Sequence, residues 1–476
     1  MTTLRGRRSA LHDLGLLTVG QILSQLLNVW ALVVIARTLG SHWFGVVQVG
    51  VAFSAYALIV AEWGMFSLGI REMSRIDDPD RALAYGRSHT GMLVLQAAVV
   101  LLAGLVLLPR LPFYHQDPAV FLLYLSAVVP QVFMQSWIAI GMERMFWVGM
   151  AKIGRSFLYA GMVLLLLSPL ARTTGWPAHR WVPLMFVVSF ALANLLTMVP
   201  LARWLGRPVL PRLPDWPEMR RRWREAAPIG ASVVTLRVLL NIDLVMLGLL
   251  AAPETAGNYA AASRLMFLLV VAVEVLWMAL LPRLSRLARQ ERDEFRRSFN
   301  HYLGFVVAGL LPIAVGGVLV GPDLVALLYG DEFPGAGPVF QVLAVSYSLL
   351  SVGYFLGNSL VAEDRQRAYF PPLVACALVA IAGTYLLIPR YGGIGACWGM
   401  FASHMLLAIT LGLLYRRTFS RRLCGLLLAL VPALGALVGA VLLAGSWPVV
   451  VRIVLGGAAY LTVGALPLLQ FARRRG

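Results

Sequence analysis

Residues 88–109 read SHTGMLVLQAAVVLLAGLVLLP and contain no Asp, Glu, Lys or Arg. A helix of about 20 apolar residues is long enough to cross the hydrocarbon core of a bilayer. No water in that core can satisfy an irregular backbone, so a segment of this kind must be helical there. The stretch therefore predicts a transmembrane helix.

Segments of the same kind recur along the whole chain. Of all residues, 59% are AVILMFWYC and only 13% are DEKR, whereas soluble domains carry about 45–50% and about 25%. This composition excludes a disordered chain, a disulfide scaffold and a soluble enzyme. It predicts an all-α polytopic membrane protein with about 14 transmembrane helices. The predicted spans are residues 12–37, 43–69, 88–109, 118–141, 146–170, 181–202, 226–250, 257–281, 300–320, 336–361, 369–388, 393–415, 422–444 and 448–470.

The basic residues are distributed unevenly between the two sides of the predicted membrane. The formal net charge is +18, from 40 Lys and Arg against 22 Asp and Glu. With the N-terminus in the cytoplasm, 32 of the basic residues fall on the cytoplasmic side and six on the opposite side. Basic residues concentrate on the cytoplasmic side of membrane proteins. We therefore expect a multi-pass protein of the cytoplasmic (inner) membrane with both termini cytoplasmic, and no nucleic-acid partner is needed to explain the charge.

The longest basic connection, residues 204–225, predicts a division of the chain. Its four prolines stiffen it, and its arginines suit an anionic inner leaflet. It separates an N-lobe, residues 1–203 with spans 1–6, from a C-lobe, residues 226–417 with spans 7–12. Residues 418–476 would add spans 13 and 14 and a basic C-terminal tail.

Two stretches in corresponding spans of the two lobes are alike. SQLLNVW at residues 24–30 of the first span aligns with RVLLNID at residues 237–243 of the seventh. Each span is followed by a short connection with a glycine, Gly45 or Gly257. This pattern predicts a parallel repeat of two six-helix lobes about an axis along the membrane normal.

An ordered set of short motifs extends from about residue 10 to residue 415. They are ARTLG at 36–40 followed by Phe44-Gly45, the segment from Gly64 to Arg71-Glu72, residues 243–250 with AGNYAAASRL at 256–265, LYGDEF at 328–333, and IPRYGGIGA at 388–396. In this order they resemble the polysaccharide (O-antigen type) flippases of the MOP superfamily. That superfamily also contains the multidrug MATE exporters and the lipid II flippases.

The resemblance implies a MATE-like fold of two six-helix lobes plus two C-terminal helices. It implies translocation of a polyprenyl-diphosphate-linked oligosaccharide, the polysaccharide or O-antigen repeat unit, by alternating access. The implied partners are this lipid-linked oligosaccharide, the bilayer, and glycan polymerase or glycosyltransferase machinery. The alternatives are a lipid II flippase and a MATE-type cation-coupled multidrug exporter.

The sequence carries no signature of an enzyme or a metalloprotein. No Walker sequence, HExxH, GxSxG or Cys/His cluster occurs, and its three cysteines fall in apolar spans. The connections on the outer side are too short for a glycan polymerase or ligase. We therefore expect a transporter without a cofactor, and a proton or sodium gradient is the expected candidate for coupling.

Ionisable residues inside predicted spans are costly and are the first candidates for function. Asp243 and Arg264 fall at similar predicted depth, so they form one candidate interhelical pair, and Glu274 and Arg237 form a second. Alternatively, Arg237 faces a central cavity and attracts a diphosphate or an acidic sugar. A further alternative is that Asp243 or Glu274 binds a coupling cation.

Glu62 lies near the cytoplasmic end of span 2 and is open to two interpretations. It either reaches the membrane interface or an arginine such as Arg71, or it lines an inward-open vestibule. Uncharged polar residues form rows at helical spacing, which either join neighbouring helices or line a wet cavity for a sugar headgroup. The candidates are Gln21, Ser24 and Asn28 in span 1, Gln131 and Gln135 in span 4, and Asn241 in span 7.

Overall fold

The protein is an all-helical membrane protein. The computed structural model describes residues 2–166, 173 and 175–473, with side chains from residue 23 onward except residue 145. In these residues the regular structure is helical and no strand occurs. Twelve of the described helices are long and apolar enough to cross a membrane. This confirms the predicted all-α multi-pass fold.

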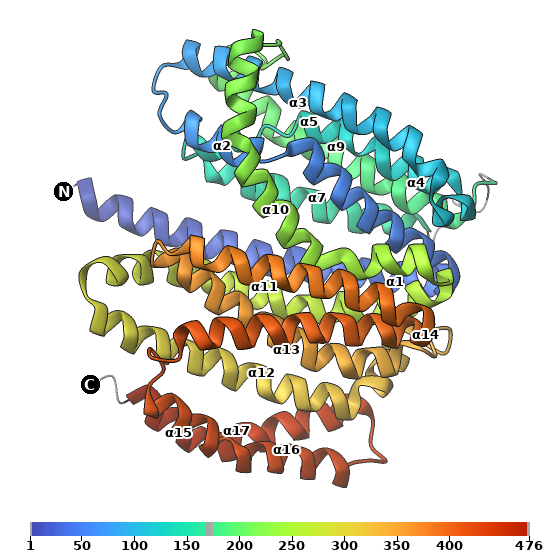
Figure 1. Cartoon of the computed structure of the whole chain (residues 1–476), viewed down its shortest axis with the longest axis vertical. Helices are drawn as coiled ribbons and strands as arrows, with labels where there is room; N and C mark the ends of the chain where they lie inside the picture. The colour runs from blue at the N-terminus through green and yellow to red at the C-terminus, as the bar shows by residue number, and fades with distance from the viewer. Residues whose placement is uncertain (1, 167–172, 174, 474–476) are drawn as a thin grey trace. The chain divides into compact units, whose positions relative to one another are not determined.

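The described chain divides into two units, Met1–Asn241 and Ile242–Gly476. In the first unit α1 packs on α3, α7 and α9 (Figure 1). The predicted span 118–141 is divided into α4, α5 and α6. Pro130 in α5 lacks the N–H that would bond the Ser126 carbonyl, and α4 ends at Ser126. The elements of this unit are α1 (Thr2–Glu62), α2 (Met65–Met73), α3 (Pro79–Leu107), η1 (Leu108–Arg110), η2 (Pro112–Gln116), α4 (Pro118–Ser126), α5 (Val128–Val132), α6 (Ser136–Gly141), α7 (Met145–Leu166), α9 (Ala178–Trp204) and the first part of α10 (Trp216–Leu250).

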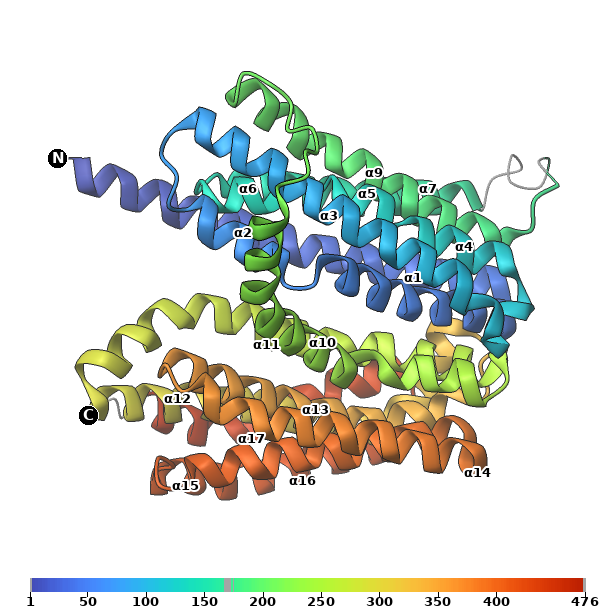
Figure 2. The same ribbon diagram turned by 45° about the horizontal axis from the view of Figure 1, so that its top comes forward.

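In the second unit α13 is the central helix and packs on α11, α12 and α14. The last helices, α15 to α17, pack on one another and on α12, as Figure 2 also shows. The unit contains the end of α10, α11 (Pro253–Gln290), α12 (Arg292–Tyr329), α13 (Ala336–Ala362), α14 (Gln366–Tyr415), α15 (Arg421–Ala429), α16 (Val431–Leu443) and α17 (Val449–Arg473).

Helix α10 begins earlier in the chain than the sequence predicted. The boundary between the two units falls later, within this helix. It starts at Trp216, inside the predicted linker 204–225, because Pro217 stands in its first turn, where a missing N–H breaks no helical bond. Its first part packs on the N-terminal unit. A Cβ on Gly64 would lie only 2.5 Å from the Ala226 carbonyl oxygen. The units therefore divide after Asn241 and not at residue 226, and the arrangement of six, six and two helices stays a prediction.

Two of the long helices are interrupted by a glycine where the sequence predicted a connection. In α1, Gly40 has φ 71° and ψ 172°, and in α14, Gly392 has φ 55° and ψ −132°. A Cβ on Gly383 would lie 2.9 Å from the Gly399 Cα, so α14 folds back on itself at Gly392. The twelve candidate spans include each interrupted helix once, and the count of fourteen crossings stays a prediction.

The close contact inside α14 makes Gly395 sensitive to substitution. A Cβ at this position would lie 2.2 Å from the Leu387 carbonyl oxygen, so Gly395→Ala must push the two arms apart. We expect a loss of about 1–3 kcal/mol of stability, measured as a lower melting temperature of the purified protein. Gly412→Ala in the same helix is the control, because a Cβ there meets nothing within 4 Å. Equal melting temperatures of the two variants would contradict the hairpin contact.

A buried carboxylate ties the start of α4 to the start of α9. Asp117 caps α4 by accepting a 3.0 Å hydrogen bond from the Ala119 N–H. It also accepts 2.7 Å hydrogen bonds from His179 Nε2 and Arg180 Nε. The His179 ring stacks on Trp43 of α1, with ring centroids 3.7 Å apart. This junction joins three helices of the N-terminal unit at one end.

The junction should make stability depend on acid. Burial raises the pKa of Asp117, but the hydrogen bonds from Arg180 and His179 outweigh burial and hold that pKa below its ordinary value of 3.8. The contribution of a depressed pKa is present above the ordinary value and is lost as the pH falls through the folded value. We expect the melting temperature of Asp117→Asn to lie below that of the natural protein at pH 7. The difference should shrink as the pH falls from 5 to 3, and a constant difference would contradict this role.

Candidate functional site

The N-terminal unit holds a polar group at the end of α1. The helix ends at Glu62, because Trp63 with φ 35° and Gly64 with φ 77° adopt left-handed conformations. The half-buried Glu62 carboxylate accepts a hydrogen bond from Gln131 Nε2 of α5. Two residues named by the sequence are thereby brought together from different helices.

The arginine suggested as a partner of Glu62 is engaged elsewhere. Arg71 of α2 forms ion pairs with Glu72 at 3.1 Å and with Glu225 of α10 at 2.7 Å. Arg71 is thus not the partner of Glu62, and the other two interpretations of Glu62, at the membrane interface or in a vestibule, stay predictions. The reason is geometric: the left-handed turn at Trp63 and Gly64 starts a new helix, and Arg71 lies on its polar face beside α10.

Arg237 of α10 lies in the same unit. Its side chain is exposed, although the residue stands well inside the candidate span Trp216–Leu250. Tyr56 of α1 donates a 3.2 Å hydrogen bond to the Arg237 carbonyl oxygen, which ties the backbone to α1. The guanidinium is close enough to act electrostatically on Glu62. The site thus combines an exposed cation with a carboxylate and an amide, groups that can donate and accept hydrogen bonds.

Arg222 is a residue of this unit that the sequence did not single out. It is only 4% exposed, donates to Ser88 at 2.9 Å, and is bonded to Glu218 one turn earlier. Its guanidinium stacks on the Tyr85 ring, 4.4 Å from the centroid. In the sequence it is one arginine of a basic run, and its burial follows only from the packing of α10 on α3.

Asp243 lies in the interior of the C-terminal unit. Its side chain is 1% exposed, and one oxygen accepts a 2.6 Å hydrogen bond from Tyr259 of α11. The other oxygen accepts a 2.8 Å bond from the Leu244 N–H. Arg264 is close enough to act on it electrostatically. Through Tyr259 this carboxylate links α10 to α11, and its role as a site for a coupling cation stays a prediction. Tyr259 was missed because a tyrosine in an apolar helix carries no signal of its own.

The remaining candidates occupy different surroundings. Glu274 is half-buried and acts electrostatically on Tyr354 of α13. Because Arg237 and Glu274 belong to different units, their pairing stays a prediction. Among the uncharged candidates, Ser24, Gln135 and Asn241 are buried and Asn28 is exposed. Gln135 Nε2 donates a 3.2 Å hydrogen bond to the Val209 carbonyl oxygen. The side chain of Gln21 lies outside the described residues.

No metal site is visible in the part of the chain that the structure describes. Groups of three or more His, Cys, Asp or Glu side chains arranged to hold an ion do not occur among those residues.

The fold occurs in solved structures of other membrane proteins. It is similar to the lipid II flippase MurJ in an inward closed conformation, with a TM-score of 0.79 and 13% identity over 96% of this chain and 100% of that one. It is also similar to an inward-facing multidrug resistance MATE transporter of the MOP superfamily, with a TM-score of 0.66 and 13% identity over 84% of this chain and 97% of that one. The chain therefore has the same overall fold as these two transporters.

Sequence comparison gives the family within this class. The model of a family described as polysaccharide biosynthesis protein matches residues 10–288, more than half of the chain. The chain belongs to this polysaccharide biosynthesis family, as the resemblance predicted.

Two curated relatives match part of the chain. The lipopolysaccharide biosynthesis protein WzxC of Escherichia coli (strain K12) is 23% identical over 70% of this chain and 65% of its own length. The capsular polysaccharide biosynthesis protein CapF of Staphylococcus aureus is 21% identical over 40% of this chain and 49% of its own length. The match thus spans about half of one relative and just under two thirds of the other.

Proposed function

We propose that the protein is a flippase that moves a polyprenyl-diphosphate-linked oligosaccharide, a polysaccharide or O-antigen repeat unit, across the cytoplasmic membrane by alternating access. The observation that carries the proposal is Arg237, an exposed cation inside a membrane-spanning helix of a chain in the polysaccharide biosynthesis family. A guanidinium inside a membrane-spanning helix is costly, and a diphosphate is a ligand that would offset that cost.

The neighbours of Arg237 support a polar headgroup as the ligand. The Glu62–Gln131 pair offers carboxylate and amide oxygens from the same unit. Asn28 of α1 is exposed, and the sequence places it in a span. Sugar hydroxyls need donors and acceptors of this kind, while the polyprenyl tail needs only lipid.

A lipid II flippase is a second candidate, because its substrate also carries a polyprenyl diphosphate and the fold is similar to MurJ. The surroundings of the carboxylates argue against a multidrug exporter of organic cations. Glu62 is bonded to Gln131 and has Arg237 nearby, and both Asp243 oxygens are engaged. A cation pump needs carboxylates without such compensation.

The orientation, the energy source and the partners are part of the proposal. The 32 to six distribution of basic residues supports two cytoplasmic termini in the inner membrane. Transport would be coupled to a proton or sodium gradient, and the product would pass to glycan polymerase or glycosyltransferase machinery.

The test is translocation in proteoliposomes. Three substrates are compared: a labelled polyprenyl-diphosphate oligosaccharide, lipid II, and a panel of cationic dyes, each with and without an imposed proton or sodium gradient. We expect the oligosaccharide lipid to move fastest. Faster movement of lipid II would select the second candidate, and dye efflux without lipid movement would overturn the flippase proposal.

A further inference from the structure

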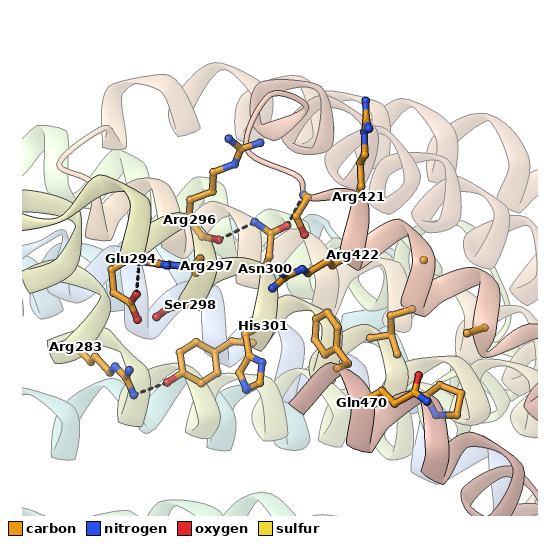
Figure 3. Close-up of a pocket in the computed structure, with 17 residues that line it drawn as sticks. Arg283, Glu294, Arg296, Arg297, Ser298, Asn300, His301, Arg421, Arg422 and Gln470 are labelled. Carbon is orange, nitrogen blue, oxygen red and sulfur yellow. Dashed lines mark hydrogen bonds and ion pairs between the residues drawn. The ribbon is translucent and has the colours of Figure 1, made fainter. Parts of the chain in front are cut away.

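A cavity of about 690 Å³ opens within the C-terminal unit, at the end of α12 that carries its first residues. It is enclosed by α12, α15 and α17, with Arg283 of α11 at its edge (Figure 3). The cavity belongs to one unit and contains none of the candidate residues for transport discussed above.

The lining of this cavity is strongly basic. Five arginines line it, Arg283, Arg296, Arg297, Arg421 and Arg422, against one acidic residue, Glu294. Glu294 forms an ion pair with Arg297 at 3.1 Å. A net positive charge of four therefore remains in the lining, gathered from three helices.

Two of these arginines are held by neutral groups, which fix their position without cancelling their charge. Arg283 donates a 3.1 Å hydrogen bond to the Tyr302 hydroxyl. Arg296 donates to the carbonyl oxygens of Thr418 and Phe419 at 2.9 and 3.4 Å. Their charge stays available to an anion in the cavity.

A buried amide fixes the geometry of the basic wall. Asn300 of α12 is 3% exposed, donates to the Thr418 carbonyl at 2.9 Å, and accepts a 2.8 Å bond from the Ser420 N–H. This amide ties α12 to the segment that leads directly into Arg421 and Arg422. In Figure 3 the Arg422 side chain extends from α15 toward Asn300, while Arg421 points away from it. The wall is thus arranged before any ligand arrives.

The other side of the cavity is apolar. Leu426, Ala429, Pro467 and Phe471 line it, and the Phe471 ring stacks on His301 with centroids 5.6 Å apart. Helices α15 and α17 also carry exposed apolar side chains beside it, such as Leu428 at 74% and Leu466 at 66%. Both helices belong to candidate membrane spans, Arg421–Leu443 and Val449–Arg473. A ligand of this site therefore meets charge on one side and a surface suited to acyl chains on the other.

We propose that this cavity binds the phosphate headgroup of an anionic phospholipid of the surrounding bilayer, with the acyl chains along α15 and α17. Guanidinium groups match phosphate oxygens in geometry and charge, and basic pockets between membrane helices are suited to anionic headgroups. The apolar wall favours a lipid over a free phosphate. The bound lipid would fasten the last three helices to α12.

The experiment measures the melting temperature of the purified, detergent-solubilised protein during titration with phosphatidylglycerol. Phosphatidylcholine and inorganic phosphate are titrated in parallel. We expect phosphatidylglycerol to stabilise the protein at concentrations at which the other two have no effect. Equal stabilisation by phosphatidylcholine would show that the charge is irrelevant, and equal stabilisation by inorganic phosphate would show a free-anion site. Either result overturns the proposal.

Two kinds of variant localise the effect. Arg421→Gln/Arg422→Gln should weaken the apparent affinity for phosphatidylglycerol about ten-fold or more, because two basic residues that attract the anionic headgroup are removed. The matched control is Arg416→Gln/Arg417→Gln, an equal change of charge at exposed residues outside the lining. Gly425→Leu keeps the charge but adds an apolar side chain to the lining, and a Cβ there meets nothing within 4 Å. It too should lose the stabilisation, and an unchanged response in both cavity variants would overturn the proposal.

Discussion

Arg237→Gln is expected to lower the rate of lipid-linked oligosaccharide translocation roughly ten- to hundredfold. Hydrogen bonds to charged groups are worth about 1.5–3 kcal/mol, and each 1.36 kcal/mol is a factor of ten in rate. The glutamine keeps a polar side chain but removes the charge that a diphosphate needs in a low-dielectric surrounding. The measurement is initial translocation rate in proteoliposomes containing equal amounts of folded protein.

One structural contact and two further variants allow the result for Arg237→Gln to be interpreted. Tyr56 bonds the backbone carbonyl of Arg237 and not its side chain, so the contact between α1 and α10 persists in the variant. Arg237→Lys keeps the charge and should retain part of the activity. Arg224→Gln is the matched control, because Arg224 is an exposed arginine on the same helix nearer its N-terminal end. If Arg237→Gln transports like Arg224→Gln, the arginine does not bind the substrate.

Asp243→Ala is expected to have the largest effect on stability, a loss of about 3–5 kcal/mol in the free energy of unfolding. The substitution leaves the Tyr259 hydroxyl and the Leu244 N–H without their acceptor inside a packed unit. It also removes the negative charge that attracts Arg264. Thermal unfolding and the yield of folded protein in detergent both report this loss.

A double substitution separates the contribution of Arg264. Asp243→Asn keeps the shape of the side chain and should impair both stability and transport, and adding Arg264→Gln should restore part of the loss. Tyr259→Phe removes one hydrogen bond and should cost less than Asp243→Ala. If the losses of Asp243→Asn and Arg264→Gln simply add, the two residues do not act as a pair.

The membrane-spanning nature of the chain could be predicted from the sequence, because burial in lipid imposes one requirement on every crossing segment. About 20 apolar residues must follow one another, and this is a local property. The exact ends of the helices could not be predicted. Whether the 204–225 connection is linker or helix depends on how Trp216 to Glu225 pack on α3, a contact between distant parts of the chain.

The sequence predicted which residues belong to the candidate site, but not which side chains they contact. Glu62, Arg237 and Asp243 stood out because an ionisable residue in an apolar span is costly. Their neighbours Gln131, Tyr56 and Tyr259 could not be assigned to them, because side chains from different helices meet only after the helices pack. Gly64 permits the left-handed turn that moves Arg71 away from Glu62, but one glycine in an apolar segment does not by itself show that the chain turns there.

The order of apolar segments, the sign of the charge and the ordered motifs by themselves determined that this is a helical membrane protein of the polysaccharide biosynthesis family. These are properties of consecutive residues and need no knowledge of the packed chain. Only the tertiary structure decided that α10 is shared between two units, that Asp243 is closed off by Tyr259, and that arginines from α11, α12 and α15 surround one cavity. The reason is that each of these features joins residues that are far apart along the chain and meet only through helix packing.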